Sequence, residues 1–147
     1  MPVFTRASGA ALATTPANSD KELGFIWVKN SEASATLAAG NCCIWDTTAA
    51  DGYSVVQADA ASQAAIVAGF VPTSEPITAG NWGRLQVYGY HSGITAATTV
   101  SVGNHLVTDG ATLVGSCDDA AASTVRSFGF FLSTATSNVA SAFIYCL

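Results

Sequence analysis

Charged side chains are scarce in this sequence. Only 10% of its 147 residues are Asp, Glu, Lys or Arg, against roughly 25% in an average soluble domain. The formal net charge is −5 and the five basic residues are scattered along the chain, so no basic stripe is available to neutralise phosphates. We therefore expect no nucleic-acid partner. The low charge favours a surface that meets other protein subunits, although a compact, alanine-rich monomer would give the same composition.

Long apolar runs are also missing. No run approaches the roughly 18 residues of a membrane-spanning helix. The first twenty residues contain Arg6 but lack the sustained apolar core of a secretory signal peptide. We therefore expect no membrane partner, and synthesis in the cytoplasm of a host cell.

The sequence lacks motifs of catalysis and metal binding. His91 and His105 are fourteen residues apart, and no Cys-x-x-Cys or His-x-x-x-His occurs. The Gly-x-Ser-x-Gly elbow and the Gly-x-x-x-x-Gly-Lys phosphate loop are absent as well. A Cys/His dyad that is assembled only in space stays open, because its members need not be close in sequence. We predict a protein that is not an enzyme and that uses no cofactor and no metal.

Four cysteines are too few for a disulfide scaffold. Cys42 and Cys43 are adjacent, so on a strand they face opposite sides and do not readily pair with each other. Cys117 and Cys146 are open to any partner. We expect buried thiols that act as small hydrophobic side chains.

Short apolar runs separated by turn signals fill most of the sequence. Gly-Asn occurs at 40–41, 80–81 and 103–104, and a strand-like run follows each pair. This spacing predicts an all-β domain over residues 21–147, a small β-barrel or β-sandwich of about eight to ten short strands. Residues 1–20, rich in Ala, Thr and Ser, are expected to form an extended N-terminal arm. Strands are expected at 24–29, 42–45, 53–57, 105–108, 126–132 and 140–147, and a loop at 117–123.

Three of these runs predict which side chains share a face. Residues 24–29 are apolar on both faces, which suits a strand buried on both sides or one in an interface. In 126–132, alternation places Phe128, Phe130 and Leu132 on one face. In 140–147, it places Ala142, Ile144 and Cys146 on one face, opposite Phe143, Tyr145 and Leu147.

The stretch 76–90 is the one around which the rest of the chain is organised. A strand after the second Gly-Asn pair directs Leu85 and Val87 to the core, and Arg84, Gln86 and Tyr88 to the opposite face.

The candidate interface residues of this stretch are Trp82, Arg84, Tyr88 and Tyr90. Trp, Tyr and Arg carry much of the binding energy in protein interfaces. A platform that stacks on sugar rings would use the same residues, and a Trp82 that only caps the core is the plain structural alternative.

The N-terminal arm supplies the other candidate contacts. Val3, Phe4 and Arg6 are the residues that we expect to hold it against a neighbouring subunit. Crystal packing or folding back onto the same domain are the alternatives.

Glycine, turn and aromatic positions recur in a defined order within 64–115. They are Ala68-Gly69-Phe70-Val71, Ile77-Thr78-Ala79-Gly80, Trp82-Gly83-Arg84-Leu85-Gln86-Val87-Tyr88-Gly89, Val102-Gly103-Asn104 and Leu106-Val107-Thr108. In this order the chain resembles the central part of small head-decoration, or cement, proteins of tailed bacteriophages. The match covers under half of the sequence.

The resemblance implies a β-rich module on the outer surface of the virion. Such proteins bind the outside of the capsid shell and bridge neighbouring major capsid proteins, often as trimers and often through a terminal arm. We therefore expect the major capsid protein as partner and a homo-oligomer, with a trimer favoured. The alternative is a glycan-binding or adhesion module of a phage tail fibre or surface appendage.

Overall fold

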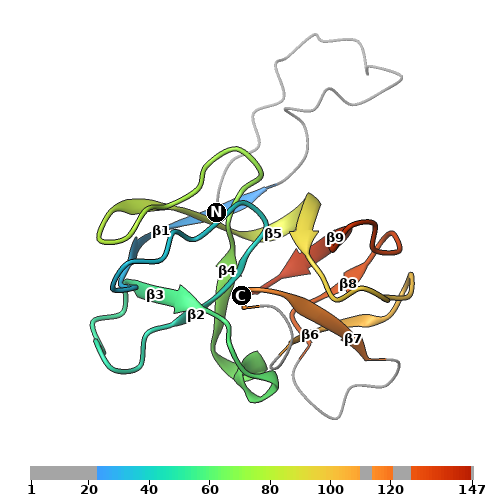
Figure 1. Ribbon diagram of the computed structural model, residues 1–147, viewed down its shortest axis with the longest axis horizontal. Coiled ribbons are helices and arrows are strands. Elements are labelled where there is room, and N and C mark those ends of the chain that lie inside the picture. The colour runs from blue at the N-terminus through green and yellow to red at the C-terminus, as the bar shows by residue number, and fades with distance from the viewer. Residues whose placement is uncertain (1–22, 110–113, 121–126, 147) are drawn as a thin grey trace, which may run out of the picture.

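The computed structural model describes residues 23–109, 114–120 and 127–146. Within these ranges the chain forms nine β-strands and one short 3-10 helix, arranged as two lobes side by side (Figure 1). The prediction of an all-β fold with about eight to ten short strands is confirmed. No helix in these ranges has the length and apolarity to cross a membrane. The elements are β1 (Gly24–Asn30), β2 (Cys42–Trp45), β3 (Ser54–Gln57), η2 (Ala61–Ile66), β4 (Val67–Phe70), β5 (Trp82–Thr95), β6 (His105–Thr108), β7 (Cys117–Ala120), β8 (Gly129–Phe131) and β9 (Val139–Tyr145).

The first lobe is a closed five-stranded barrel. Its strand order is β1-β3-β2-β4-β5, and β5 returns to pair with β1. The β1–β3 pair is parallel, whereas the other pairs are antiparallel. A closed sheet leaves no unpaired strand edge. Its interior is filled by the first core, which consists of Val28, Leu37, Cys43, Val55, Ala68, Val71, Ile77 and Leu85.

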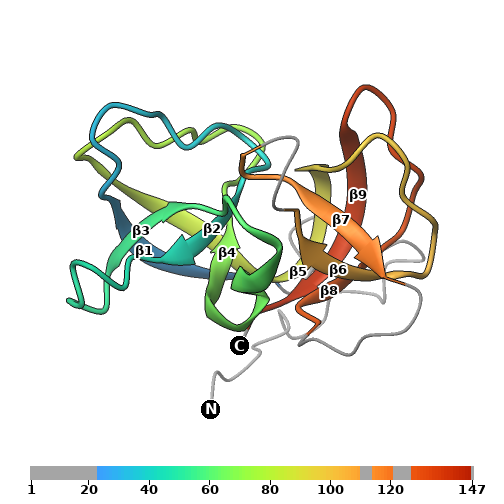
Figure 2. The same ribbon diagram turned by 60° about the horizontal axis from the view of Figure 1, so that its bottom comes forward.

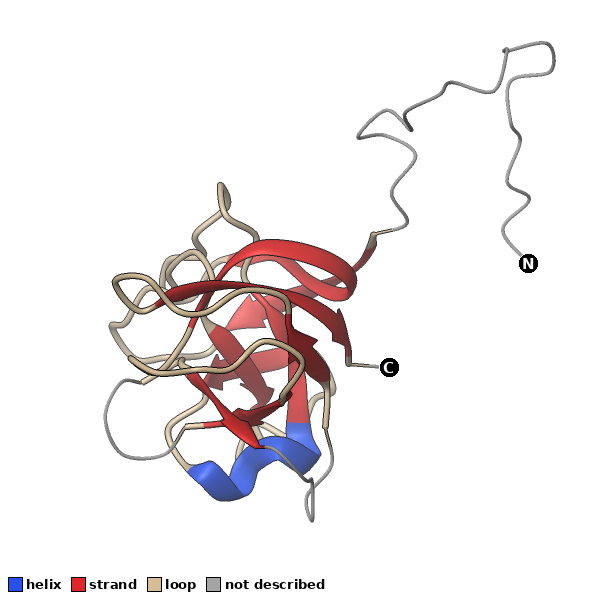
Figure 3. Ribbon diagram, turned by 90° about the vertical axis from the view of Figure 1, so that its right-hand side faces the viewer, coloured by secondary structure: helices blue, strands red, loops and turns tan. Residues whose placement is uncertain are grey.

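The second lobe is an open antiparallel sheet in the order β5-β9-β8-β6-β7. Figure 2 shows this sheet beside the barrel, with β5 running between the two. Between this sheet and the barrel strands β2 and β4 lies a second core, and η2 lies at one end of the strands (Figure 3). The largest fully buried side chains of the second core are Phe70, Phe128, Phe131, Leu106, Ile94 and Ile144.

Strand β5 belongs to both lobes. Its first half pairs with β1, and its second half, from Tyr88 to Thr95, pairs with β9 with an irregularity between His91 and Ile94. Leu85 and Val87 are 0% and 2% exposed, so the predicted core face of this strand is confirmed. Tyr88 pairs with both Gly24 of β1 and Tyr145 of β9. The first residue of β1 and the last residue of β9 therefore meet at one position of β5.

The three Gly-Asn pairs form three copies of one turn. Gly40, Gly80 and Gly103 have φ of +79°, +76° and +84°. A positive φ at the third residue, closed by a hydrogen bond from the fourth residue to the first, defines a type II turn and favours glycine. The turns lead into β2, β5 and β6, as the sequence predicts. The closing bonds are Asn41 N–H to Ala38 O (3.0 Å), Asn81 N–H to Thr78 O (3.1 Å) and Asn104 N–H to Ser101 O (3.2 Å).

The prediction of a loop at 117–123 is wrong for residues 117–120. These residues form β7, which pairs with β6 along its whole length. Aspartate disfavours strands, but the Asp119 carboxylate accepts hydrogen bonds from Ser101 N–H (2.7 Å) and Asn104 Nδ2 (2.9 Å). These partners, distant in sequence, compensate for placing the carboxylate beside the sheet.

The prediction that Phe128, Phe130 and Leu132 share one face is also wrong. The face predicted for Ala142 and Ile144 in 140–147 is confirmed. Phe128 and Phe131 are 2% and 0% exposed, but Leu132 is 42% exposed. The strand β8 begins only at residue 129, so the alternation does not extend back to Phe128. In β9, Ala142 and Ile144 are both fully buried.

The three similar turns allow a matched test of one close contact. A Cβ atom on Gly40 would lie 2.3 Å from the carbonyl oxygen of Gly93, whereas a Cβ atom on Gly80 would meet nothing within 4 Å. Both substitutions by alanine carry the strain of positive φ, about 1–2 kcal/mol, and only Gly40→Ala adds a clash with backbone. We expect Gly40→Ala to lower the free energy of unfolding at least twice as much as Gly80→Ala, measured by urea denaturation. Equal losses would contradict this packing.

Candidate interaction surface

The four candidate residues of β5 lie in one row along the strand. Trp82, Tyr88 and Tyr90 are 55%, 37% and 41% exposed, and Arg84 is half-buried. This row faces away from the buried Leu85 and Val87. The other three candidates, Val3, Phe4 and Arg6, lie outside the described residues.

Five side chains gather on the outside of the barrel where β5 closes against β1, and we call them the seam surface: Phe25, Trp27, Tyr53, Trp82 and Arg84. Trp27 lies opposite Arg84 in the register of the two strands, and its side chain is 67% exposed. The rings of Tyr53 and Trp82 stack with their centroids 5.1 Å apart. The guanidinium carbon of Arg84 lies 4.9 Å from the centroid of the Phe25 ring, a cation–π geometry.

An ion pair holds Arg84 in place. Its Nε donates a 3.1 Å hydrogen bond to the Glu75 carboxylate, and its Nη2 donates a second bond to the other oxygen. These bonds lower the pKa of Glu75 and raise that of Arg84. Both side chains are 39% exposed, so the pair adds little stability in water. Its effect is to fix the guanidinium over Phe25 and to offset the positive charge of the seam surface.

Tyr88 lies in a second aromatic group, on the outward face of the other lobe. Tyr88 meets Phe143 edge to face at 5.4 Å, and Phe143 stacks on Phe130 at 5.6 Å. Tyr90 lies opposite Phe143 in the register of β5 and β9. Tyr90 lies eight positions after Trp82, which corresponds to at most about 26 Å of extended strand. Of the four candidate residues of β5, Trp82 and Arg84 thus belong to the seam surface, and Tyr88 and Tyr90 belong to this second group.

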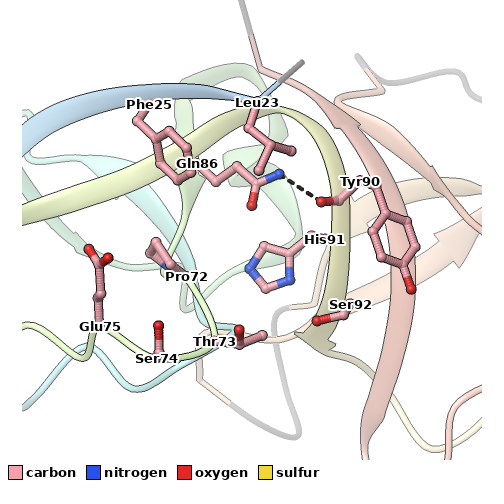
Figure 4. Close-up of a pocket in the computed structure, with 10 residues that line it drawn as sticks. All are labelled: Leu23, Phe25, Pro72, Thr73, Ser74, Glu75, Gln86, Tyr90, His91 and Ser92. Atoms are coloured by element: carbon pink, nitrogen blue, oxygen red, sulfur yellow. Dashed lines mark hydrogen bonds between the residues drawn. The ribbon is translucent and has the colours of Figure 1, made fainter. Parts of the chain in front are cut away.

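A cleft of about 400 Å³ lies between the outward face of β5 and residues 72–75 (Figure 4). The Gln86 side chain lines it and donates hydrogen bonds to the backbone carbonyls of Tyr88 (3.2 Å) and Tyr90 (3.0 Å). Gln86 therefore lies in the outward row, as predicted, yet is only 5% exposed. Phe25 and Glu75 extend the cleft towards the seam surface.

His91 lines the same cleft, and both of its ring nitrogens are engaged by backbone. Nε2 lies 2.9 Å from the carbonyl oxygen of Val71, and Nδ1 accepts a 3.2 Å hydrogen bond from Gly93 N–H. Burial lowers the pKa of His91, so the neutral ring is favoured. The described lining of the cleft contains neither Cys nor Asp, and the dyad left open by the sequence is not assembled there.

The other histidine lies near a hydroxyl group. His105 Nδ1 is 3.1 Å from Ser127 Oγ, which in turn lies 3.0 Å from the Tyr145 hydroxyl. Within the described ranges, no three His, Cys, Asp or Glu side chains are grouped so that they could hold a metal ion.

Three members of the seam surface, Phe25, Trp27 and Tyr53, are not among the site residues that the sequence predicts. The sequence predicts Phe25 and Trp27 on one face of a strand that is either buried on both sides or part of an interface. The structure buries Val28 fully and leaves Trp27 as the most exposed of the large apolar side chains described. Tyr53 joins Trp82 only through the closure of the barrel, and no sequence signal predicts that contact.

Fold and surface together define a small all-β module with an aromatic outer surface. The chain matches no protein-family model and no curated protein. Among solved structures it is similar to the "N base" of the head fiber protein gp8.5 of bacteriophage phi29, with a TM-score of 0.56 and 13% sequence identity. The alignment covers 85% of this chain and 96% of that chain. At this identity the similarity establishes a shared fold.

The buried histidine predicts how stability depends on pH. The unfolded state binds a proton near pH 6.5, whereas the folded state resists protonation because the pKa of His91 is lowered. Stability is therefore highest above about pH 6.5 and falls as the pH decreases from there towards the lowered pKa of His91. The carboxylates with lowered pKa, including Asp46 and Glu75, lose their contribution only at lower pH, around and below about 4.

Urea denaturation between pH 7.5 and 5 tests this dependence. We expect the free energy of unfolding of the unsubstituted protein to decrease over this range, and the decrease to be smaller in His91→Gln. His105→Gln, which keeps His91, is the matched control and should retain the decrease. A decrease that disappears in His105→Gln and persists in His91→Gln would refute the assignment.

Proposed function

We propose that the protein is a structural protein of a bacteriophage head, a decoration or cement module that binds the outside of the capsid and bridges neighbouring major capsid proteins. The observation that carries the proposal is an exposed aromatic surface on a fold shared with the base of a phage head fiber. The order of glycine, turn and aromatic positions in 64–115 supports the same assignment.

The composition of the seam surface favours a protein partner. Trp, Tyr and Arg are the residue types that dominate binding energy when they are buried in an interface. Trp27, Tyr53 and Trp82 are 67%, 42% and 55% exposed, so they have much apolar area left to bury. The charge of Arg84 is offset by Glu75, which reduces the cost of removing this surface from water.

The proposed activity is mechanical. A DNA-filled shell is weakest at the contacts between its capsomers, and a module that spans two of them adds buried area there. A standard interface buries about 1,600 Å² in total. Many copies on one shell act together, so modest affinity at each site is sufficient.

Oligomerisation and the N-terminal arm complete the proposal. A homo-oligomer, with a trimer favoured, would present several seam surfaces to the lattice at once. Val3, Phe4 and Arg6 are the arm residues proposed to contact a neighbouring subunit.

The base of a head appendage is a second candidate, and the similarity to the base of a phage head fiber favours it. A sugar-binding role for such an appendage would have to use either the seam surface or the group around Tyr88, because the two are separate. If the domain still bound heads when further domains were attached to it, the appendage role would be favoured over the cement role.

Single substitutions on the seam surface test the docking role. Trp27→Ala and Trp82→Ala should each weaken binding to isolated heads of the encoding phage at least tenfold, the effect typical of a central interface residue. Binding is measured by co-sedimentation over a range of protein concentrations. Leu132→Ala is the matched control, since Leu132 is an exposed apolar side chain (42%) in the second lobe, and it should bind normally.

The arm is tested in the full chain by replacing Val3, Phe4 and Arg6 together with alanine. Loss of the oligomer in sedimentation equilibrium, or loss of head binding, is the expected result. Normal oligomerisation and normal head binding in this variant, with both tryptophan variants unaffected, would refute the decoration role. Glycan binding that is lost in Trp82→Ala would then identify the adhesion alternative.

A further inference from the structure

Two cysteines that are far apart in sequence meet in the second core. Cys42 is the first residue of β2 in the barrel, and Cys117 is the first residue of β7 in the other lobe. Both are 0% exposed, and both belong to the same buried cluster. Cys42 N–H donates a 2.7 Å hydrogen bond to the carbonyl oxygen of Gly115. This bond brings the two strand starts together, and both fully buried side chains pack in the same core cluster.

We propose that Cys42 and Cys117 are a disulfide-forming pair, reduced when the chain is made and joined when the folded protein meets a low-molecular-weight disulfide such as oxidised glutathione. In the first step one thiolate attacks this disulfide, forms a mixed disulfide and releases one glutathione thiol. In the second step the other cysteine attacks the mixed disulfide and releases the second glutathione. The protein loses two thiol hydrogens as protons, and its two electrons reduce one oxidised glutathione to two thiols.

The fold selects this pair among the four cysteines. Cys43 is adjacent to Cys42 in sequence, but its side chain lies in the barrel core, with Sγ 3.8 Å from the Asn41 carbonyl oxygen. The two adjacent cysteines therefore face different cores, as the sequence predicts. Cys146 is half-buried at the margin of the second core.

The bond would join the two lobes covalently. It connects the barrel strand β2 to β7, the edge strand of the open sheet. The loop that it closes runs from residue 42 to residue 117 and contains most of the fold. Long loops give the largest restriction of the unfolded chain. Formation is expected to be slow, because burial and the neighbouring Cys117 thiol raise the pKa of Cys42 and keep its thiolate scarce. The chemistry of the pair does not depend on the proposed function.

The test oxidises the native full-length protein with oxidised glutathione at pH 8, followed by alkylation of the remaining thiols and peptide mapping. We expect two of the four thiols to disappear and a Cys42–Cys117 cross-linked peptide to form. Thermal unfolding should then shift upwards, on the order of 5–10 °C. Adding a reducing agent should reverse the shift.

Alanine variants identify the partners. Cys42→Ala and Cys117→Ala should lose the cross-link and the thermal shift. Cys43→Ala is the matched control, since it also removes a fully buried thiol next to Cys42, and it should keep both. If a variant fails to fold, the peptide map of the unsubstituted protein still decides.

Several results would overturn the proposal. One is a native protein that keeps all its thiols although the same treatment cross-links it in urea. Another is a dominant link that involves Cys43 or Cys146, or a stable glutathione adduct at Cys42. An oxidised protein that melts at the same temperature as the reduced one, or below it, would refute the stabilising role.

Discussion

The pairing of β5 with two different partners is the constraint on which the rest of the structure depends. Its first half closes the barrel against β1, and its second half supports β9 and through it the open sheet. On its buried side, Leu85 in the first half packs in the barrel core, and Ile94 in the second half packs in the second core. The opposite side carries the aromatic row. Buried packing and exposed surface are thus fixed by the same fourteen residues.

Much of this arrangement can be predicted from the sequence because it is local. The turns at Gly40, Gly80 and Gly103 and the strands that follow them depend on residues within a few positions of each other. The burial of Leu85 and Val87 follows from simple alternation. These features need no knowledge of what lies across the sheet.

The remainder depends on tertiary contacts. Asp119 lies in a strand because the turn at 101–104 satisfies its carboxylate. Gln86 can be buried because backbone carbonyls further along β5 accept hydrogen bonds from its side-chain amide. The seam surface exists only because closure of the barrel brings Tyr53 to Trp82 and β1 to Arg84. The sequence therefore predicts only the β5 side of this aromatic surface and leaves the role of β1 open.

The meeting of β1 and β9 at Tyr88 has a practical consequence for engineering. Since Gly24 and Tyr145 both pair with this residue, the two ends of the described fold open beside each other, next to the aromatic row. A short linker is enough to join them, so the domain is suited to circular permutation, with new ends in a distant turn such as 46–52. A fusion partner attached directly to Gly24 or Tyr145 would emerge beside Tyr88 and the aromatic surface around it, and would compete with whatever covers that surface. A fusion partner that must leave that surface free is better attached at the new ends of a permuted chain, in such a turn.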